Sequence, residues 1–207
     1  MTASTRTVGR PSSNSAQDAQ QLIIQAASKN FAEHGIKGTS NQMIARDANV
    51  TPAMVHYYFR NKTDLHQAIL ANIFEPCIEK LQKASALVEW VGIFHGHLSA
   101  NLWIPHLMIR EILPHNGSMR PIFLQQFGPR IFSSIKQMVE QEMQQQKTQK
   151  AFDVERHVIL LMGMLVYPFL GLGIAENITG RKFDQQMLDG FRDDALNLFT
   201  KGIAGNE

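Results

Sequence analysis

The sequence predicts an all-α protein, because helical periodicity runs along almost the whole chain and no strand pattern competes with it. Apolar residues recur at three- and four-residue spacing from residue 16 to residue 203, whereas no segment alternates convincingly between apolar and polar residues. Of the 207 residues, 44% are hydrophobic and 18% are charged, so the chain can bury a sizeable core.

The N-terminal third begins with a polar arm and one amphipathic helix. Residues 1–15 are rich in Ser and Thr and lack any helical period, so we expect them to form a disordered basic arm. Residues 16–34 place apolar side chains at helical spacing and form the first expected helix. Gly35 follows, at the position where a left-handed residue commonly ends a helix.

Two short helices are expected next, each opened by a hydroxyl side chain. Thr39 or Ser40 can cap the first of them. Thr51 caps the second, with Pro52 at its first position, where the missing N–H of proline costs nothing. The turn between the two helices has only three or four residues and contains the apolar Val50, as a helix-turn-helix requires.

The remaining two thirds of the chain carry only helical patterns and are expected to form a bundle. Its first helix is capped by Asn61 and should kink at Pro76. The last two helices, 154–178 and 184–203, are apolar enough to need a partner, so a four-helix interface between two copies is expected. The apolar stripe of the final helix consists of Met187, Leu188, Phe191, Ala195, Leu198 and Phe199.

Residues 158–175 form a run of 18 residues without a charge, which is just long enough to cross a bilayer as a helix. Pro168 and several glycines interrupt this run, and neither end carries an aromatic belt or a one-sided basic cluster. A helix buried in a dimer is therefore favoured over a membrane span, and a membrane-anchored protein is kept as an alternative.

The charge of the chain is unevenly distributed. Residues 1–62 carry a net charge of +4 and the remaining residues a net charge of −2, with His counted as neutral. Any polyanion that the protein binds is therefore expected to meet the N-terminal third.

The sequence gives little support for enzymatic activity or for metal binding. Cys77 is the one cysteine, which excludes an intramolecular disulfide, and residues 1–19 do not form a secretory signal peptide, so a cytoplasmic protein is expected. His95 and His97 are two residues apart and fall on different faces of a helix. No catalytic or nucleotide-binding motif is present, so we expect no cofactor, no metal and no enzyme.

A longer segment carries a family resemblance. From Ile23 to Leu65 the chain reads I-I-Q-A-A, F-A-E-H-G-I-K-G-T-S, I-A-R-D-A-N-V-T and H-Y-Y-F-R-N-K-T-D-L, and it resembles the TetR family of bacterial transcriptional regulators. Asn49 stands where the family usually has Gly, although Asn tolerates a left-handed backbone better than other non-glycines. His56 replaces a common Tyr and Met43 a usual polar residue, which bears on the DNA sequence that is read.

The resemblance implies an N-terminal three-helix DNA-binding domain, residues 16–62, and a C-terminal helical bundle, residues 63–207, for ligand binding and dimerisation. The implied function is ligand-responsive regulation by a homodimer on a palindromic double-stranded DNA operator, with repression favoured. A small apolar or amphipathic molecule would release the DNA. An all-α ligand-binding or enzymatic protein that no longer reads DNA is a further alternative.

The second short helix is the expected reader of base edges, since its side chains can donate, accept or contact thymine methyls. These candidates are Pro52, Ala53, Met54, His56 and Tyr57, and Thr51 at the start of the helix can meet either base edges or phosphates. Phosphate contacts are expected from Thr39, Ser40, Lys62 and in part Tyr58, at the starts of helices or beside the core. The two tyrosines could instead pack against the first helix. Arg6 and Arg10 resemble arms that enter a minor groove, although a solvated tail is the simpler alternative.

Bulky or polarisable residues of the bundle are candidates for an inducer pocket, although such stripes more often form the core. The candidates are Trp90, Phe94, His97, Trp103, Met108, Arg110, Phe123, Phe127, Met162 and Tyr167. Arg110 could orient a polar group of the ligand or pair with Glu111 at the helix surface, and the surface pair is favoured.

Overall fold

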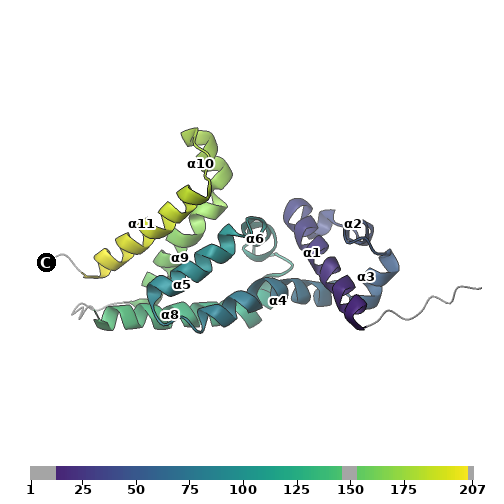
Figure 1. The fold of residues 1–207 in the computed structure, drawn as a ribbon, viewed down its shortest axis with the longest axis horizontal. Helices are drawn as coiled ribbons and strands as arrows, with labels where there is room; N and C mark the ends of the chain where they lie inside the picture. The colour runs from purple at the N-terminus through teal and green to yellow at the C-terminus, as the bar shows by residue number, and fades with distance from the viewer. Residues whose placement is uncertain (1–12, 146–152, 205–207) are drawn as a thin grey trace, which may run out of the picture. The chain divides into compact units, whose positions relative to one another are not determined.

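The computed structural model describes residues 13–145 and 153–204, and its regular structure within those residues is entirely helical (Figure 1). This confirms the predicted all-α fold class. The chain divides into two compact units, Met1–Ile69 and Leu70–Glu207. The division falls within helix α4 (Lys62–Leu81), so this helix contributes residues to both units.

The first unit opens with helix α1 (Ser13–Gly38), which starts before the expected residue 16. Its backbone leaves the helical conformation at Gly35, where φ is 72° and ψ is 166°. A positive φ suits glycine because it has no Cβ, so the regular helix stops where the sequence placed a glycine. Residues 1–12 of the expected arm lie outside the described residues.

Two short helices, α2 (Asn41–Asp47) and α3 (Pro52–Tyr58), follow as predicted. Ser40 caps α2 and Thr51 caps α3, each by accepting a backbone N–H with its side-chain oxygen. A helix leaves its first N–H groups without internal partners, so each cap satisfies one of them.

The turn between α2 and α3 is tight and held by backbone hydrogen bonds. Asn49 has a φ of 53°, in the left-handed region that glycine usually occupies, and its N–H donates to the carbonyl of Arg46 at 3.1 Å. The N–H of Val50 donates to the carbonyl of Ala45 at 2.9 Å. The expectation that Asn49 adopts a left-handed conformation is therefore confirmed.

A small apolar core holds the first unit together. Val55 on α3 and Phe59 at its end point inward, and they are 2% and 6% exposed. A side-chain hydrogen bond links the first two helices, because Asn30 Nδ2 donates to Asp47 Oδ2 at 2.8 Å. The other helices contribute the buried side chains Ile23, Ala27, Phe31, Ile44, Ala45, Leu65 and Ile69.

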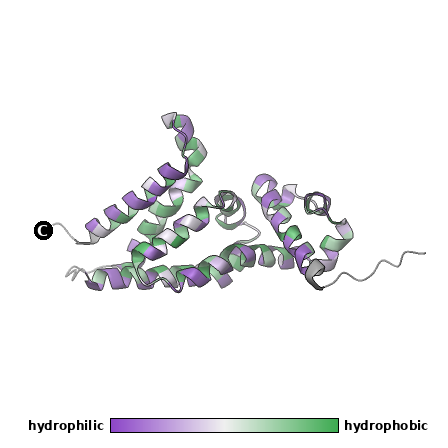
Figure 2. Cartoon of the chain, viewed as in Figure 1, coloured by the Kyte–Doolittle hydropathy of each residue, from purple (hydrophilic) through white to green (hydrophobic). Residues whose placement is uncertain are grey.

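The second unit is a bundle of longer helices. After α4 come α5 (Leu87–Ser99), α6 (Trp103–Leu107), α7 (Arg120–Ile122), α8 (Gly128–Gln145), α9 (Val154–Leu170), α10 (Leu172–Thr179) and α11 (Gln185–Ala204), with the π-helical turns η1 (Met108–Ile112) and η2 (Phe123–Phe127). Helices α5, α8, α9 and α11 all pack against one another. Figure 2 shows that α9 and α10 are mainly hydrophobic, whereas α11 is mostly hydrophilic.

Pro76 lies inside α4, which continues to Leu81, and the expected kink there stays a prediction. The π-helical turn η2 leads directly into α8, which begins with Gly128 and Pro129. Proline cannot donate a backbone N–H and its ring crowds the preceding turn. A wider turn relieves that crowding without ending the helix.

The expectation of one helix over residues 154–178 is wrong. The chain forms α9 and α10, which meet at Gly171 with a bend of 68°. Pro168 removes one backbone donor near the end of α9, and Gly171 is a poor helix former. The helix therefore breaks at Gly171, and α10 begins with the next residue. Within the described residues no single helix is long and apolar enough to cross a membrane, and only this bent pair meets the length and composition test.

The apolar stripe of the last helix also differs from the expectation, because much of it faces its own chain. Leu188, Ala195 and Phe199 are buried within the unit, whereas Leu198 is 68% exposed. His95 on α5 lies 2.9 Å from the backbone oxygen of Leu188 through its Nε2. Only part of α11 is therefore left for contact with a partner.

One buried side chain makes the first unit sensitive to acid. His66 is 6% exposed, its ring lies 5.7 Å from the ring of Phe31, and its Nε2 has no hydrogen-bond partner among the described residues. Burial, assisted by the charge of Lys62, lowers the pKa of His66 from 6.5 to about 4. Between these pH values the unfolded chain binds a proton that the folded chain does not bind.

We expect the free energy of unfolding to fall as the pH drops from about 6.5 to about 4, with up to about 3 kcal/mol due to His66. The His66→Phe variant keeps a ring but cannot titrate, so its unfolding free energy should fall less over this range. The slope should not vanish, because burial also lowers the pKa values of His95 and His97. Urea unfolding at several pH values compares the two proteins, and equal slopes would contradict the assignment.

Candidate nucleic-acid interface and ligand cavity

Helix α3 presents one face to solvent while its other face enters the core. Pro52, Ala53, His56 and Tyr57 are exposed, and Met54 is half-buried. A seven-residue helix has only about two turns, so residues near both of its ends share the exposed face. This exposed face is long enough to place several side chains against base edges in a major groove.

The hydroxyl groups that cap α2 and α3 can each still donate a hydrogen bond to a phosphate. Ser40 Oγ accepts the N–H of Met43 at 3.2 Å, and Thr51 Oγ1 accepts the N–H of Met54 at 3.3 Å. Accepting a hydrogen bond leaves the hydroxyl proton free to donate elsewhere. The hydroxyl of Thr39 differs, because it donates to the carbonyl of Gly35 at 2.8 Å.

Lys62 is the first residue of α4, so its positive charge lies where that helix also presents free backbone N–H groups. Its side chain is exposed. The preceding Asn61 caps the helix, with its Oδ1 accepting the N–H of Asp64 at 2.9 Å. A cation and a helix start at one place suit a DNA phosphate.

The two tyrosines of α3 have different surroundings. The side chain of Tyr57 is 76% exposed, whereas Tyr58 is half-buried. Their rings meet edge to face, with centroids 5.2 Å apart. Tyr57 is thus available for contact with DNA, and Tyr58 combines packing with a partly accessible ring.

One polar contact at this surface was not anticipated from the sequence. Asn41 Nδ2, in the first residue of α2, lies 3.0 Å from His56 Nε2 on α3. An amide NH2 group only donates, so in this arrangement the ring nitrogen accepts. The two residues are far apart in sequence, and only the geometry of the turn brings them together. Arg6 and Arg10 lie outside the described residues.

The second unit contains a cavity of about 240 Å³. Its walls come from α4, α5, α8, α9 and the two π-helical turns, and they include Phe74, Cys77, Phe94, His97, Leu98, Met108, Phe123, Gly128, Ile131, Phe132, Ile135, Met162 and Val166. Five candidates from the sequence meet in this cavity: Phe94, His97, Met108, Phe123 and Met162.

Four other candidates lie elsewhere. Trp90 and Phe127 are fully buried in the core, and the indole N–H of Trp90 donates to Ser134 Oγ at 2.9 Å. Tyr167 is 72% exposed on α9. Trp103, at the start of α6, is half-buried and belongs to none of the cavity walls above.

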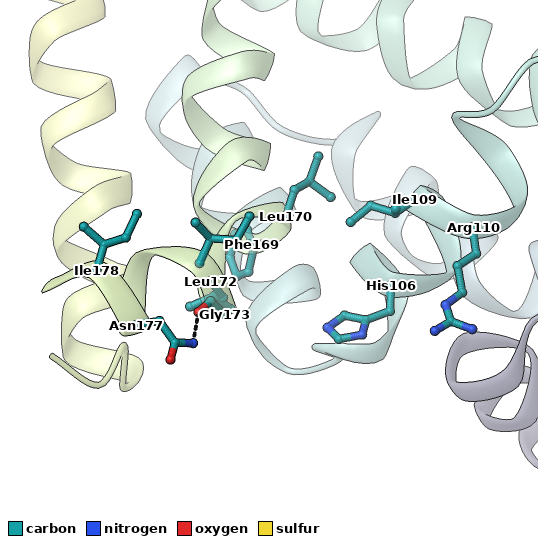
Figure 3. A pocket seen from close by; sticks show the side chains of 10 residues that line it. His106, Ile109, Arg110, Phe169, Leu170, Leu172, Gly173, Asn177 and Ile178 are labelled. Carbon is teal, nitrogen blue, oxygen red and sulfur yellow. Dashed lines mark hydrogen bonds between the residues drawn. The ribbon is translucent and has the colours of Figure 1, made fainter. Parts of the chain in front are cut away.

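Arg110 lines a second hollow, an open groove of about 620 Å³ between α6, η1 and the α9–α10 bend (Figure 3). In this view His106 and Arg110 lie on one side and Ile178 on the opposite side. Glu111 is buried while Arg110 is exposed, and the favoured pairing of the two stays a prediction.

Cys77 fits a packing role. Its side chain is buried, and burial raises the pKa of its thiol to about 11. The thiolate, which is the reactive form, is therefore scarce at neutral pH. Within residues 13–145 and 153–204, no group of three His, Cys, Asp or Glu side chains could hold a metal ion.

The chain has the features of a helix-turn-helix DNA-binding protein. These are the tight turn between α2 and α3, the exposed face of α3 and the lysine at the start of α4. Residues 23–69 match the model of the tetR family of bacterial regulatory proteins. These residues therefore form a DNA-binding helix-turn-helix of the tetR type, and the chain is similar to transcriptional regulators over more of its length.

Individual relatives agree with this class. The HTH-type transcriptional regulator YhgD of Bacillus subtilis is 25% identical over 133 residues, which cover 61% of this chain and 68% of that protein. AcrR of Shigella flexneri is 30% identical over 108 residues, which cover 52% and 44%. These relatives are transcriptional regulators rather than enzymes, in agreement with the class expected from the sequence.

Two solved structures share the fold. HlyIIR, a hemolysin II transcriptional regulator, is 26% identical with a TM-score of 0.59, and the match covers 84% of this chain and 97% of that chain. The TetR family regulator PfmR from Thermus thermophilus is 16% identical with a TM-score of 0.67, covering 86% and 97%. The second likeness concerns the fold alone.

Lys62→Ala should weaken DNA binding about equally on all sequences, because the ammonium group would meet phosphate rather than a base. The slope of log affinity against log salt should become shallower by about one unit. Fluorescence anisotropy over a salt series measures this, with Lys29→Ala, which removes an exposed charge from α1, as the control. A changed base preference would refute the phosphate role.

Tyr57→Ala should cost on the order of 1–3 kcal/mol on the operator and little on random DNA, if the side chain reads a base edge. Tyr57→Phe separates the hydroxyl from the ring. Because Tyr57 is 76% exposed, both variants should fold normally. Competition binding with the two DNAs provides the measurement, and equal losses on both would assign Tyr57 to packing.

Proposed function

We propose that this regulator is a ligand-responsive repressor that binds a palindromic operator as a homodimer in the cytoplasm. The observation that carries the proposal is the exposed face of α3 behind a turn fixed by Asn49. The contacts proposed for DNA are those of Pro52, Ala53, Met54, His56 and Tyr57 with bases. Phosphates would be held by Ser40, Thr51, Tyr58 and Lys62, and by Thr39 once its hydroxyl exchanges the carbonyl of Gly35 for a phosphate oxygen. Arg6 and Arg10 would enter the adjacent minor groove.

Exposed apolar side chains on α9 and α11 support the dimer. On α9, Ile159 is 64%, Leu160 55% and Tyr167 72% exposed, and on α11 Leu198 is 68% exposed. The ring centroids of His157 and Phe199 are 6.4 Å apart, so the start of α9 lies beside the end of α11. Large exposed apolar side chains that gather in one region commonly mark an interaction site, and a second copy of the chain would cover them.

A two-fold dimer explains why the operator should be palindromic. The same surface of each copy would form the interface, so the two α3 helices would be related by a two-fold axis. Such helices fit half-sites about 34–36 Å apart, or a further turn away. An error of a few ångströms would leave one half of the dimer without its contacts.

The cavity of about 240 Å³ in the second unit is the proposed inducer site. Helix α4 starts at Lys62, which would contact phosphate, and its residues Phe74 and Cys77 line the cavity. A ligand that alters the position of these two side chains can therefore act on DNA binding through one helix. A preference of about 3 kcal/mol for the released state would weaken operator binding about 100-fold.

Ile159→Asp should break the dimer, because a charge would have to be buried against the partner copy. We expect the variant to be monomeric at micromolar concentration and to bind the operator at least about 100-fold more weakly, since each half-site alone binds poorly. Val88→Asp is the matched control, because Val88 is 61% exposed on α5.

Analytical ultracentrifugation and operator titrations compare the three proteins. A dimer that persists in Ile159→Asp with unchanged operator affinity would rule out the α9 and α11 face. A wild-type chain that binds every DNA weakly and without salt dependence would favour a protein that no longer reads DNA.

A further inference from the structure

We propose that Asn41 fixes the tautomer of His56, so that His56 presents an N–H donor to the DNA and reads a guanine. This assignment rests on the proposed function, since His56 is among the base contacts proposed for α3. Three observations carry it: the contact between the two side chains, the exposed ring of His56 and the place of His56 on α3.

The contact between the two side chains joins α2 to α3 across the turn. Asn41 Nδ2 lies 3.0 Å from His56 Nε2, which is hydrogen-bond distance. The amide nitrogen of asparagine donates and does not accept, so Nε2 is the acceptor and carries no proton. Which ring nitrogen of a histidine is protonated depends on the hydrogen bond that the other nitrogen makes. The proton of the neutral ring therefore lies on Nδ1.

The second ring nitrogen of His56, Nδ1, is the one left for DNA. It forms no hydrogen bond within the described part of the chain, and the ring is exposed. His56 follows Pro52 by four residues and Ala53 by three, so these three exposed side chains share one face of α3. The first residues of a recognition helix are the ones that meet base edges. His56 thus extends this face by one turn.

A ring nitrogen that only donates discriminates between bases. In the major groove guanine presents two neighbouring acceptors, N7 and O6, and no donor. Adenine and cytosine place an amino group on this edge, and thymine places a methyl group beside its single acceptor. An N–H donor therefore fits guanine best, because two acceptors lie within its reach and no neighbouring group opposes it.

Asn41 is a positioning residue in this arrangement, because it acts on DNA through the ring of His56. Without the amide, the exposed ring is free to rotate and to exchange between its two neutral tautomers. In the second tautomer Nδ1 accepts, and it would then favour the amino groups of adenine or cytosine. The contact across the turn therefore selects which bases the ring can bind.

NMR identifies the protonated ring nitrogen directly. The full chain is isotope-labelled in its histidine nitrogens and measured at about pH 8.5, where histidine rings are neutral, and the His56→Ala variant assigns the signals by their loss. We expect the wild-type ring of His56 to carry its proton on Nδ1, and the ring in Asn41→Leu to populate both tautomers. A wild-type ring with its proton on Nε2 would overturn the proposal, and this spectrum decides even if Asn41→Leu does not fold.

Selection from a pool of random double-stranded DNA, followed by anisotropy titrations of single sites, measures the base preference. In the site that the wild type selects, one G·C pair in each half should depend on His56. Replacing this pair by A·T should weaken binding about 2- to 12-fold, the value of one hydrogen bond, and should have no effect in His56→Ala. Asn41→Leu should lose most of this preference. The double variant should lose no more than His56→Ala alone.

Gln42→Leu is the matched control, because Gln42 is the next residue of α2 and is exposed. It should keep both the tautomer of His56 and the preference for guanine. A His56-dependent pair other than G·C would overturn the reading of guanine. A loss in His56→Ala that is equal on all DNA would assign His56 to phosphate instead. A guanine preference and a tautomer that both survive in Asn41→Leu would overturn the role of Asn41.

The same selection separates this inference from the proposed function. An inverted repeat in which no position depends on His56 would contradict the reading by His56 and leave the palindromic operator standing. A His56-dependent G·C pair in an asymmetric site would contradict the palindromic operator while the reading by His56 stands. A wild-type chain that selects no motif would contradict both.

Discussion

The turn between α2 and α3 is the constraint on which the DNA-binding surface depends. A left-handed residue at Asn49 reverses the chain within a few residues, and the backbone bonds of Asn49 and Val50 to the end of α2 hold the reversal in place. Because the turn is short, the inward side chains Val55 and Phe59 fix the rotation of α3 about its own axis. The exposed face of α3 follows from this rotation, and so does the contact of Asn41 with His56. A residue other than Gly, Asn or Asp at position 49 would destabilise the turn, because its side chain clashes with the backbone at a positive φ.

The proposed inducer site in the second unit depends on what the core leaves unfilled. Trp90, Phe127 and Phe169 are almost wholly buried, so these aromatic side chains pack in the core. The cavity remains where α5 and α8 approach the two π-helical turns. A π-helical turn widens the backbone locally and shifts the side chains that follow it, which makes complete filling of the neighbouring space difficult. Pro129, which favours this wider turn, thereby contributes to a cavity that it does not line.

Local signals in the sequence predicted much of the fold and less of the sites. Caps at Ser40 and Thr51 and the glycine stop at Gly35 depend on near neighbours, so their positions could be predicted well. The length of α9 could not, because apolar composition alone does not locate the bend at Gly171. The cavity walls depend on contacts between distant helices, which explains why five pocket candidates meet there while Trp90 and Tyr167 do not. The contact of Asn41 with His56 likewise has no local signal.

The central claim is that two copies of the α3 surface read one symmetrical DNA site, and the DNA itself tests it most directly. Genomic fragments retained by the full chain can be sequenced and aligned. The account predicts one enriched inverted repeat, with half-site centres about 10 base pairs apart or a multiple of that spacing. Retained fragments that share only an asymmetric motif, or no motif, would contradict it.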